Sequence, residues 1–531
     1  MQLALVIISQ KTLCSLAKIS PKEVEPVLTE LGIPLEGSEG DKLSVEITPN
    51  RPDWLSVEGI ARSCYSYKFA KPKLYTAQKS NVYWKIDPSV KKVCPYLGSA
   101  LIKGINLNPE TFDSIIQLQE KLHDTFGRQR KKMSVGIYDM KNITPPFTFK
   151  AIKPDEMSFV PLDKASPMTP AQILREHEKG IQFAHLVKDL CAMIVDKNNE
   201  VLAFIPIINA ESSKLTPDST DLLIDCTGFH EKTVLTAINI ICAAMVDRGA
   251  KAYSVQIDGK TYPLFEKIKN PLPLSEANNL LGLSLDKKQA AYHLSRLGHE
   301  VESNFVFSQA FRADIMHSVD LIEDIAISYG YNNFNPIIPD FPSTPSYSDH
   351  SPLHEACIGL GYFEVSSWIL TNKKVLTNSQ LDLSSALSVK NPLTEEFTTL
   401  RPWLYPNLLQ IFANSKSETY PQFLYEFGPV IQKQGGKFVQ HEHLCLAATH
   451  SKAGFSQSLS HLKGFLSALG SSESLSEHDT PGFIPGRCAK IKISGQQAGI
   501  IGEIHPQVLE NFSIEQPVAL FEIDVKFLEK K

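Results

Sequence analysis

Four carboxylates are concentrated in the segment FRADIMHSVDLIEDIAISYGY, residues 311–331, where together they could hold a metal ion. Asp320, Glu323 and Asp324 stand at positions i, i+3 and i+4, so a helix would place them on one face. Asp314 lies six residues before Asp320. Four oxygen ligands suit a hard cation, which favours Mg²⁺ over zinc. The alternative is that acidic residues early in a helix only complement its dipole, and spacing alone leaves both interpretations open.

A second candidate site is basic. Arg128, Arg130, Lys131 and Lys132 follow a predicted helix that ends at Gly127. Such a cluster could contact several phosphates of a nucleic acid, and a solvated loop is the alternative. The whole chain has 53 Lys and Arg against 58 Asp and Glu, a net charge of −5, so it has no general basic field. Any nucleic-acid contact is therefore expected to be local or shared with a partner.

The elements that must position these residues are predicted from capping signals. A Ser, Thr, Asp or Asn before the helix, a Pro at its first position and a Gly after its end mark several helices. The predicted helices follow Ser20, Asn108, Ser284 and Ser318, with a further one over about 231–248. Short β-branched or aromatic runs lie between them without regular strand–helix alternation. The fold class predicted is α+β, and 531 residues require several domains.

Composition and targeting signals indicate a cytoplasmic protein with no membrane anchor. Nine cysteines are scattered without a CxxC pair, as is usual for reduced cytosolic thiols. The longest helical apolar stretch, 235–246, is well short of the ~20 residues that span a bilayer. In the segment 334–349, Pro336, Pro339, Pro342 and Pro345 recur every third residue, which predicts an extended spacer.

The motif TPNRPDWLSVEGIAR at 48–62, taken with the acidic segment, resembles the β subunit of phenylalanyl-tRNA synthetase in its archaeal and eukaryotic-cytosolic form. The resemblance covers nearly the whole chain, and the motifs appear in family order. The others are RKKMSVGIYDM (130–140), HEKG (177–180), FIPIINAE (204–211), TDLLIDCTG (220–228), NPLTEEFTTLRPWLYPNLL (391–409), FLYEFGPV (423–430), FIPGRCAKI (483–491) and GIIGEIHP (499–506).

The resemblance implies a role for the acidic segment and a set of partners. It implies that Asp314, Asp320, Glu323 and Asp324 bind Mg²⁺, although many relatives carry Glu where Asp324 stands. It also implies an (αβ)₂ heterotetramer with the α subunit and a tRNA(Phe) substrate. ATP and phenylalanine would be bound mainly by the α subunit. The sequence agrees, because it contains no GxGxGxER run of the kind class II synthetases use to hold ATP.

Four parts are expected from the resemblance. They are an N-terminal α+β module (1–90), an editing-type domain (91–266), a small Mg²⁺-associated domain (267–338) and a catalytic-like class II synthetase fold without the active site (339–531). The last is expected to be an antiparallel sheet domain. Arg401, in TLRPWL, is interpreted as a packing residue rather than a catalytic arginine.

The editing-type domain would hydrolyse tyrosine wrongly attached to tRNA(Phe). Such a step is needed because an apolar pocket built for phenylalanine rejects an analogue that adds one hydroxyl by only about 10²-fold. The candidate pocket residues are polar side chains where buried strands end: Asn209, Ser212, Asp225 and Thr227. For Asp225 and Thr227, capping of the helix near Glu231 is the alternative.

The function expected is therefore that of the β subunit of phenylalanine–tRNA ligase, an aminoacyl-tRNA synthetase subunit with possible editing hydrolysis. The alternative is a non-enzymatic RNA-binding or scaffold protein that retains the same folds.

Overall fold

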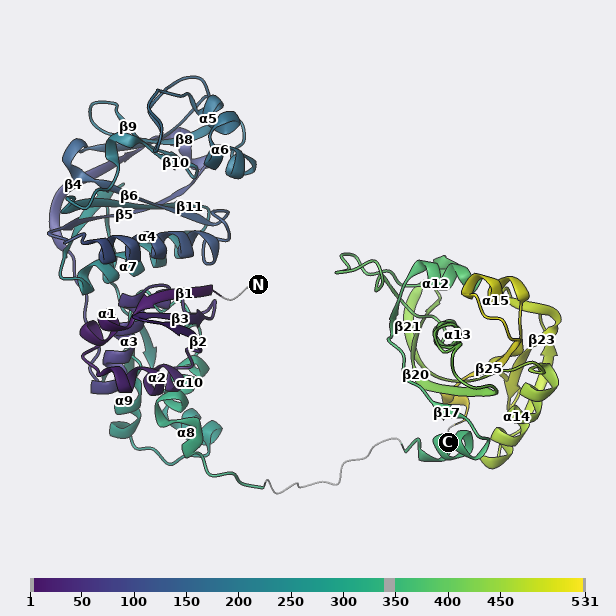
Figure 1. Cartoon of the computed structure of the whole chain (residues 1–531). Helices are drawn as coiled ribbons and strands as arrows, with labels where there is room; N and C mark the ends of the chain where they lie inside the picture. The colour runs from purple at the N-terminus through teal and green to yellow at the C-terminus, as the bar shows by residue number, and fades with distance from the viewer. Residues whose placement is uncertain (1–3, 339–348, 529–531) are drawn as a thin grey trace. The chain divides into compact units, whose positions relative to one another are not determined.

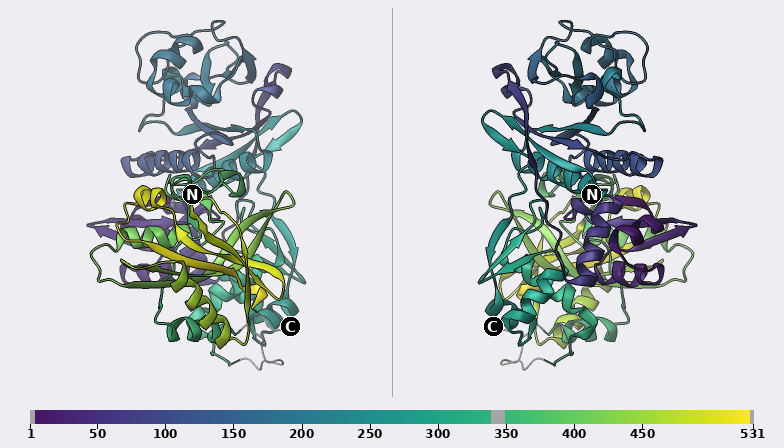
Figure 2. Two further views of the ribbon diagram at one scale, coloured as in Figure 1. Left: turned by 90° about the vertical axis from the view of Figure 1, so that its right-hand side faces the viewer. Right: turned by 90° about the vertical axis from the view of Figure 1, so that its left-hand side faces the viewer.

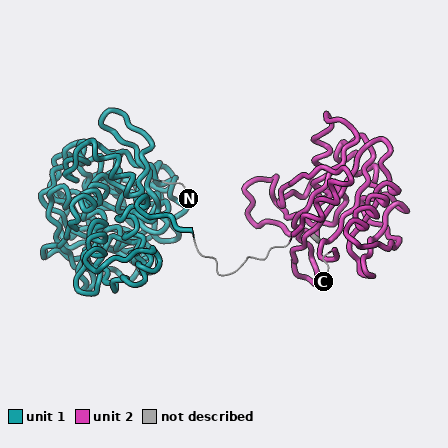
Figure 3. Tube along the Cα trace, turned by 90° about the horizontal axis from the view of Figure 1, so that it is seen from below, with its two compact units in different colours: residues 1–338 teal, residues 339–531 magenta. Residues whose placement is uncertain are grey.

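The computed structural model describes residues 4–338 and 349–528 of the chain. Within it the chain forms two compact units, Met1–Ile338 and Pro339–Lys531, which Figure 3 shows in different colours. Each unit mixes helices with mainly antiparallel sheets, which confirms the predicted α+β class. The proline-rich spacer lies mostly outside the described residues.

The first unit begins with a three-stranded antiparallel sheet of order β1-β3-β2. Its strands are β1 (Ala4–Ser9), β2 (Leu35–Glu39) and β3 (Lys42–Ile47), and its helices are α1 (Gln10–Ala17), α2 (Pro21–Glu30) and α3 (Val57–Phe69). The predicted start of α2 is confirmed, because Ser20 and Glu23 form a capping box and Pro21 opens the helix.

A ten-stranded sheet lies at one end of the first unit (Figure 1). Its order is β10-β9-β8-β7-β4-β12-β5-β11-β6, and β13 pairs with β12. The strands are β4 (Gln78–Ile86), β5 (Tyr96–Lys103), β6 (Met133–Asp139), β7 (Phe147–Ile152), β8 (Cys191–Val195), β9 (Val201–Ile205), β10 (Ile208–Asn209), β11 (Asp221–Gly228), β12 (Lys251–Ile257) and β13 (Lys260–Tyr262). Because β4 pairs with β12 and β7, the strand belongs to this sheet although it precedes the predicted boundary at residue 90.

Two long helices, α4 (Pro109–Asp124) and α7 (Glu231–Asp247), lie between this sheet and the N-terminal sheet (Figure 1). The side views agree, with blue α4 above the purple N-terminal elements (Figure 2). One apolar core runs through this layer and includes Val6, Ile60, Leu118 and Ile238. The shorter helices α5 (Pro170–Glu176) and α6 (Glu178–Phe183) accompany β8 to β10 at the far end of the sheet.

The first unit ends with a small α+β part. Its sheet has the order β14-β16-β15, and its elements are β14 (Ile268–Pro271), α8 (Leu274–Leu281), α9 (Lys287–Arg296), β15 (Glu300–Glu302), β16 (Phe305–Ser308) and α10 (Ser318–Tyr329). The predicted helix after Ser284 begins at Lys287, because Asp286 is its cap. Helix α10 carries the acidic segment.

The second unit is built on a seven-stranded sheet of order β17-β20-β21-β25-β24-β23-β22, antiparallel except between β17 and β20. Its strands are β17 (Phe363–Glu364), β20 (Gln422–Gln434), β21 (Lys437–Thr449), β22 (Glu473–Glu477), β23 (Phe483–Ile493), β24 (Gln496–Ile504) and β25 (Val518–Asp524). The short strands β18 (Leu370–Thr371) and β19 (Thr399–Leu400) pair separately. The helices are α11 (Ser351–Gly359), α12 (Lys373–Asn378), α13 (Tyr405–Asn414), α14 (Phe455–Ala468) and α15 (Pro506–Phe512).

Both faces of the seven-stranded sheet carry an apolar core. The core on one face contains Leu408 of α13 and Val508 of α15, and the core on the other contains Cys357 of α11 and Leu462 of α14. No helix in the described ranges combines the length and the apolar composition that a membrane span requires.

Candidate functional site

A cavity of about 470 Å³ lies beside β6 and the turn between β9 and β10 in the first unit. Its lining comes from one side of α4, from Arg130, and from residues 134, 135, 137, 162–164, 177–179, 204–209 and 214–215. The walls are partly apolar, with Phe112, Ile137 and Phe204, and partly polar, with Glu120, His177 and Asn209 among others. A mainly apolar wall with a few convergent polar groups is typical of a small-molecule site.

Of the four predicted editing residues, Asn209 lines this cavity. Its side-chain amide lies 3.5 Å from the carbonyl oxygen of Ile137. Ser212 is exposed and does not line the cavity, and its carbonyl oxygen accepts a hydrogen bond from Asn142 at 3.2 Å. The structure therefore separates Asn209 and Ser212, although both follow the same strand.

Thr227 lines a second, smaller hollow of about 20 Å³. A space of this size holds about one water molecule. The Thr227 hydroxyl lies 3.1 Å from the Ser134 hydroxyl, with which it shares a hydrogen bond. The two hollows have Arg130, Ser134, Ile205 and Pro206 in common, so they share a wall.

Asp225 lies two residues before Thr227 on β11 and is completely buried. The Tyr138 hydroxyl donates a hydrogen bond to one carboxyl oxygen at 2.5 Å, and the other oxygen has no hydrogen-bond partner among the described residues. Burial raises the pKa of the Asp225 carboxyl to about 7, and the hydrogen bond from Tyr138 partly opposes this. Neither Asp225 nor Thr227 caps α7, because His230 is the cap of that helix.

No cysteine near these hollows has an activated thiol. Cys94 lines the smaller hollow, but burial raises the pKa of its thiol to about 12. Cys226 lies between Asp225 and Thr227 on β11, and burial raises the pKa of its thiol as well. Because the thiolate is the nucleophilic form, covalent catalysis by these cysteines is not supported near neutral pH.

Two histidines, His123 and His177, also line the cavity, and neither was among the predicted site residues. His123 Nε2 accepts a hydrogen bond from the Val135 amide at 2.8 Å, which leaves Nδ1, 3.5 Å from Glu120, to carry the proton. Burial lowers the pKa of His123. His177 is buried and caps α6 by accepting from the Lys179 amide at 3.2 Å. For Glu120 and His123, the local signal in the sequence was their spacing at i and i+3, just before the basic cluster.

The basic cluster does not point in one direction. Arg128 and Lys131 are exposed and Lys132 is half-buried. Arg130 is only 8% exposed and lines both hollows, so it is not available as a surface contact for phosphate. Its guanidinium donates to the carbonyl oxygens of two residues of the β9–β10 turn, and burial lowers its pKa. Of the four cations predicted to contact phosphates, Arg130 therefore faces inward.

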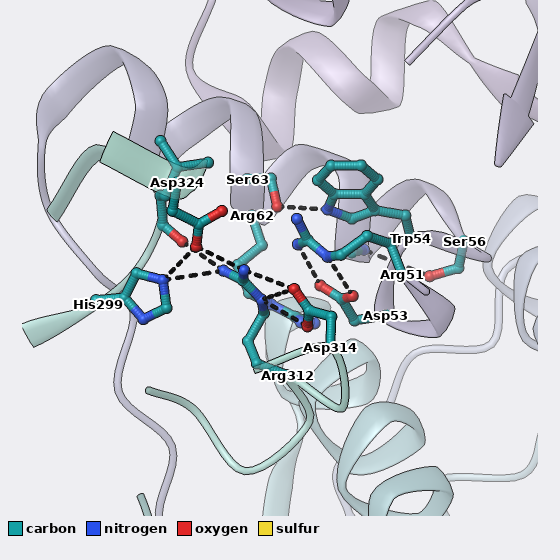
Figure 4. Close-up of polar contacts among 12 residues, drawn as sticks. Arg51, Asp53, Trp54, Ser56, Arg62, Ser63, His299, Arg312, Asp314 and Asp324 are labelled. Carbon is teal, nitrogen blue, oxygen red and sulfur yellow. Dashed lines mark hydrogen bonds and ion pairs between the residues drawn. The ribbon is translucent and has the colours of Figure 1, made fainter. Parts of the chain in front are cut away.

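The four carboxylates of the acidic segment have separate environments. Asp314 and Asp324 both bind the Arg312 guanidinium, at 2.8 and 2.6 Å (Figure 4). Asp320 caps α10 by accepting from the Met316 and His317 amides at 2.7 Å. Glu323 is exposed. Among the described residues, no group of three or more His, Cys, Asp or Glu side chains is arranged to hold a metal ion.

Asp324 is buried and also lies 2.5 Å from His299 Nε2. Burial alone would raise the pKa values of Asp324 and Asp314, but the Arg312 guanidinium outweighs it and lowers both. Ionised carboxylates are the donor type that Mg²⁺ prefers, so the donor chemistry fits. The arrangement fits only in part, because the Arg312 guanidinium already binds two of the four.

The TPNRPDW motif lies next to this acidic segment. Arg51 binds Asp53 at 2.8 Å and stacks on Trp54, with its guanidinium carbon 3.5 Å from the ring centre. Figure 4 shows this group beside Arg312 and Asp314, and the Arg51 charge contributes to the lowered pKa of Asp314. The two motifs that stand out most in the sequence therefore meet in one buried ionic cluster.

In the second unit Arg401, which is expected to be a packing residue, lies in a buried ion pair. It is 1% exposed, binds Glu426 at 2.6 Å and donates to the Pro429 carbonyl oxygen at 3.0 Å. A second buried carboxylate, Glu522, accepts the amides of Leu404 and Tyr405 at the start of α13, at 2.9 and 3.0 Å.

Comparison with known proteins assigns both units. A family model described as "Phenylalanyl tRNA synthetase beta chain CLM domain" matches residues 339–525, and one described as "tRNA synthetase B5 domain" matches residues 271–331. The chain is thus a tRNA synthetase subunit by its domains.

Full-length relatives then identify the particular family. "Phenylalanine--tRNA ligase beta subunit" from Archaeoglobus fulgidus is 38% identical over 94% of each chain. The protein of the same name from Methanospirillum hungatei is 34% identical over 98% of this chain and 97% of its own length. The chain belongs to the phenylalanine–tRNA ligase β-subunit family, which confirms the family predicted from the sequence.

A solved structure supports the assignment of the first unit. The crystal structure of an N-terminal fragment of the phenylalanyl-tRNA synthetase β-subunit from Pyrococcus horikoshii superposes with a TM-score of 0.58 and 32% identity. The superposition covers 61% of this chain and 99% of the fragment. None of these comparisons supports the alternative of a non-enzymatic scaffold.

Proposed function

We propose that this chain joins an α subunit in an (αβ)₂ heterotetramer that attaches phenylalanine to tRNA(Phe) with ATP. The full-length similarity to phenylalanine–tRNA ligase β subunits carries this proposal. ATP and phenylalanine are bound mainly by the α subunit, which accords with the lack of a GxGxGxER run in this sequence. The complex acts in the cytoplasm. Activation of phenylalanine by this chain alone would contradict the proposal, and restoration of activity by an α subunit would support it.

The cavity in the first unit is proposed as an editing site that hydrolyses tyrosyl-tRNA(Phe). Its volume of about 470 Å³ and its mixed apolar and polar wall fit a tyrosine side chain and the terminal ribose. The neighbouring water-sized hollow, bounded by the Ser134 and Thr227 hydroxyls, is the proposed place of the attacking water. A buried polar site that hydrogen-bonds the tyrosine hydroxyl discriminates well against phenylalanine.

A matched pair of variants tests this site. Asn209→Ala removes a polar group of the cavity wall, and Ser212→Ala changes an exposed side chain three residues away. The complex with Asn209→Ala or Thr227→Val should lose at least tenfold in tyrosyl-tRNA deacylation, and Ser212→Ala should match the wild type. Equal activity of all three variants would place the site elsewhere.

We also propose that the acidic segment binds Mg²⁺ through Asp320 and Glu323, the two carboxylates without a basic side-chain partner among the described residues. Asp314 and Asp324 would add negative charge behind them. Mg²⁺ should raise the Tm of the wild type relative to chelator, and Glu323→Gln should reduce that difference. Glu276→Gln on α8, also exposed, is the control. An unchanged difference in the Glu323 variant would show that these acids are a charged helix face.

The domain division proposed is four parts, with the first boundary moved to about residue 77 because β4 pairs within the ten-stranded sheet. Contact with tRNA is proposed at the exposed cations Arg128 and Lys131, with Lys132 half-buried beside them.

A further inference from the structure

Three consecutive residues other than glycine adopt a left-handed backbone where α4 is followed by the basic cluster. The φ angles of Arg128, Gln129 and Arg130 are 51°, 53° and 62°. Such residues persist in this conformation only where the surrounding structure holds them. Their amides bond back to the carbonyl oxygens of Thr125, Asp124 and His123. We call residues 128–131 the basic turn.

The side chain of Arg130 anchors the basic turn to the cavity. Its Nη1 donates to the carbonyl oxygens of Pro206 and Ile207, at 3.0 and 2.9 Å. The guanidinium also stacks on Phe183, 4.5 Å from the ring centre, and lies 3.5 Å from Glu120. Both carbonyl oxygens belong to the β9–β10 turn that forms the wall shared with the smaller hollow.

The outer side of the same turn is free to meet a ligand. Arg128, Gln129 and Lys131 are exposed. In the described part of the chain neither Arg128 nor Lys131 has a carboxylate within ion-pair distance, whereas Arg130 has Glu120. Unpaired cations on a rigid turn suit the phosphates of an RNA backbone. A ligand bound to Arg128 and Lys131 would therefore contact the same short segment that holds Arg130.

We propose that Arg130 is a positioning residue that couples RNA contact on the basic turn to the wall of the cavity formed by Pro206 and Ile207. This inference rests on the proposed editing function. With the tRNA backbone on Arg128 and Lys131, Arg130 holds the wall at the place where the aminoacyl ester must meet the attacking water. Arg130 lines both hollows, and its proposed part is to hold this wall in place rather than to react.

The test uses the α–β complex with two substrates, tyrosyl-tRNA(Phe) and the tyrosyl ester of adenosine, which cannot reach the basic turn. Arg130→Ala should lower kcat at least tenfold for both substrates, with less than a threefold change in KM. Arg130→Lys should recover part of kcat, because lysine can donate to the carbonyl oxygens but cannot stack as a planar fork. Phe183→Leu removes the stacking alone and should give a smaller loss.

The double variant Arg128→Ala, Lys131→Ala should raise KM for the tRNA substrate, reduce its dependence on salt and lower kcat. It should leave the adenosine ester unaffected. Once Arg130 is alanine, adding these changes should no longer lower kcat for the tRNA substrate, because coupled residues are not additive.

Two results overturn the inference while leaving the editing function intact. One is wild-type kcat in an Arg130→Ala complex whose wild type hydrolyses tyrosyl-tRNA, and the other is fully multiplicative effects of the changes at 130 and at 128 and 131. A wild-type complex that hydrolyses neither substrate overturns the editing function itself. If Arg130→Ala fails to fold, Arg130→Lys and Phe183→Leu carry the same comparison, with Tm measured for each.

Discussion

The buried carboxyl of Asp225 should make the stability of the first unit depend on pH. An ordinary aspartate carboxyl has a pKa of about 3.9, and a difference of one in pKa corresponds to about 1.4 kcal/mol. A pKa of about 7 in the folded state therefore makes the ionised form roughly 4 kcal/mol less favourable in the folded than in the unfolded chain. Between these two values the folded state binds more protons, so stability falls as pH rises from about 4 and levels off above about 7.

The magnitude that can be observed is smaller than the whole penalty. At pH 5.5 the unfolded chain is already ionised, so about half of the roughly 4 kcal/mol is present. Between pH 5.5 and 8.5 the wild type should lose roughly 2 kcal/mol through this group. For a melting unit of this size that loss is about 3 °C in Tm.

Asp225→Asn is the decisive variant, since the amide keeps an oxygen for the Tyr138 hydroxyl and cannot ionise. Calorimetric melting of the full chain at several pH values should give a Tm difference, variant minus wild type, that increases by about 3 °C from pH 5.5 to 8.5. Tyr138→Phe removes the hydrogen bond that favours ionisation, so its stability should fall at least as steeply with pH. Asp221→Asn, half-buried on the same strand, is the control. Parallel curves for wild type and Asp225→Asn would refute the reasoning.

Two further predictions concern packing. Glu426→Ala leaves the Arg401 guanidinium buried without its partner and should cost about 3–5 kcal/mol in the unfolding of the second unit. Changing Arg401 to Met and Glu426 to Leu together should cost less unfolding free energy than Glu426→Ala alone. If denaturant titrations give the same cost for both variants, the unpaired charge is not the cause. Gly59→Ala places a methyl group 1.6 Å from the Asp53 carbonyl oxygen and should lower the Tm of the first unit. Gly37→Ala meets no atom within 4 Å and should melt like the wild type.

Local signals in the sequence were enough to predict five of the helices, α2, α4, α7, α9 and α10. The caps at Ser20 and Asn108 lie within one helical turn of the amides that they satisfy, and a proline directly follows each cap. The order of strands was out of reach, because β4 and β12 pair across more than 160 residues of sequence. Nothing local to either strand specifies such a partner.

The candidate sites show the same division. Of the four residues that the sequence pointed to, Asn209 and Thr227 line neighbouring hollows, and Ser212 and Asp225 line neither. It did not reveal that Arg130 turns inward, because its acceptors are carbonyl oxygens of residues 206 and 207, and carbonyl positions leave no mark in a sequence. It also placed Asp314 and Asp324 with the metal without showing that Arg312 binds both.

The junction between the TPNRPDW motif and the small α+β part has a consequence for recombining members of the family. Arg62 of α3 stacks on Phe311, 4.3 Å away, and Arg296 of α9 donates to the Tyr67 carbonyl oxygen at 2.9 Å. The small part therefore cannot be exchanged with that of a relative as if it were an independent cassette. A functional chimaera would have to inherit α3 and residues 48–54 from the same parent as residues 267–331, although some 200 residues separate them in the gene product.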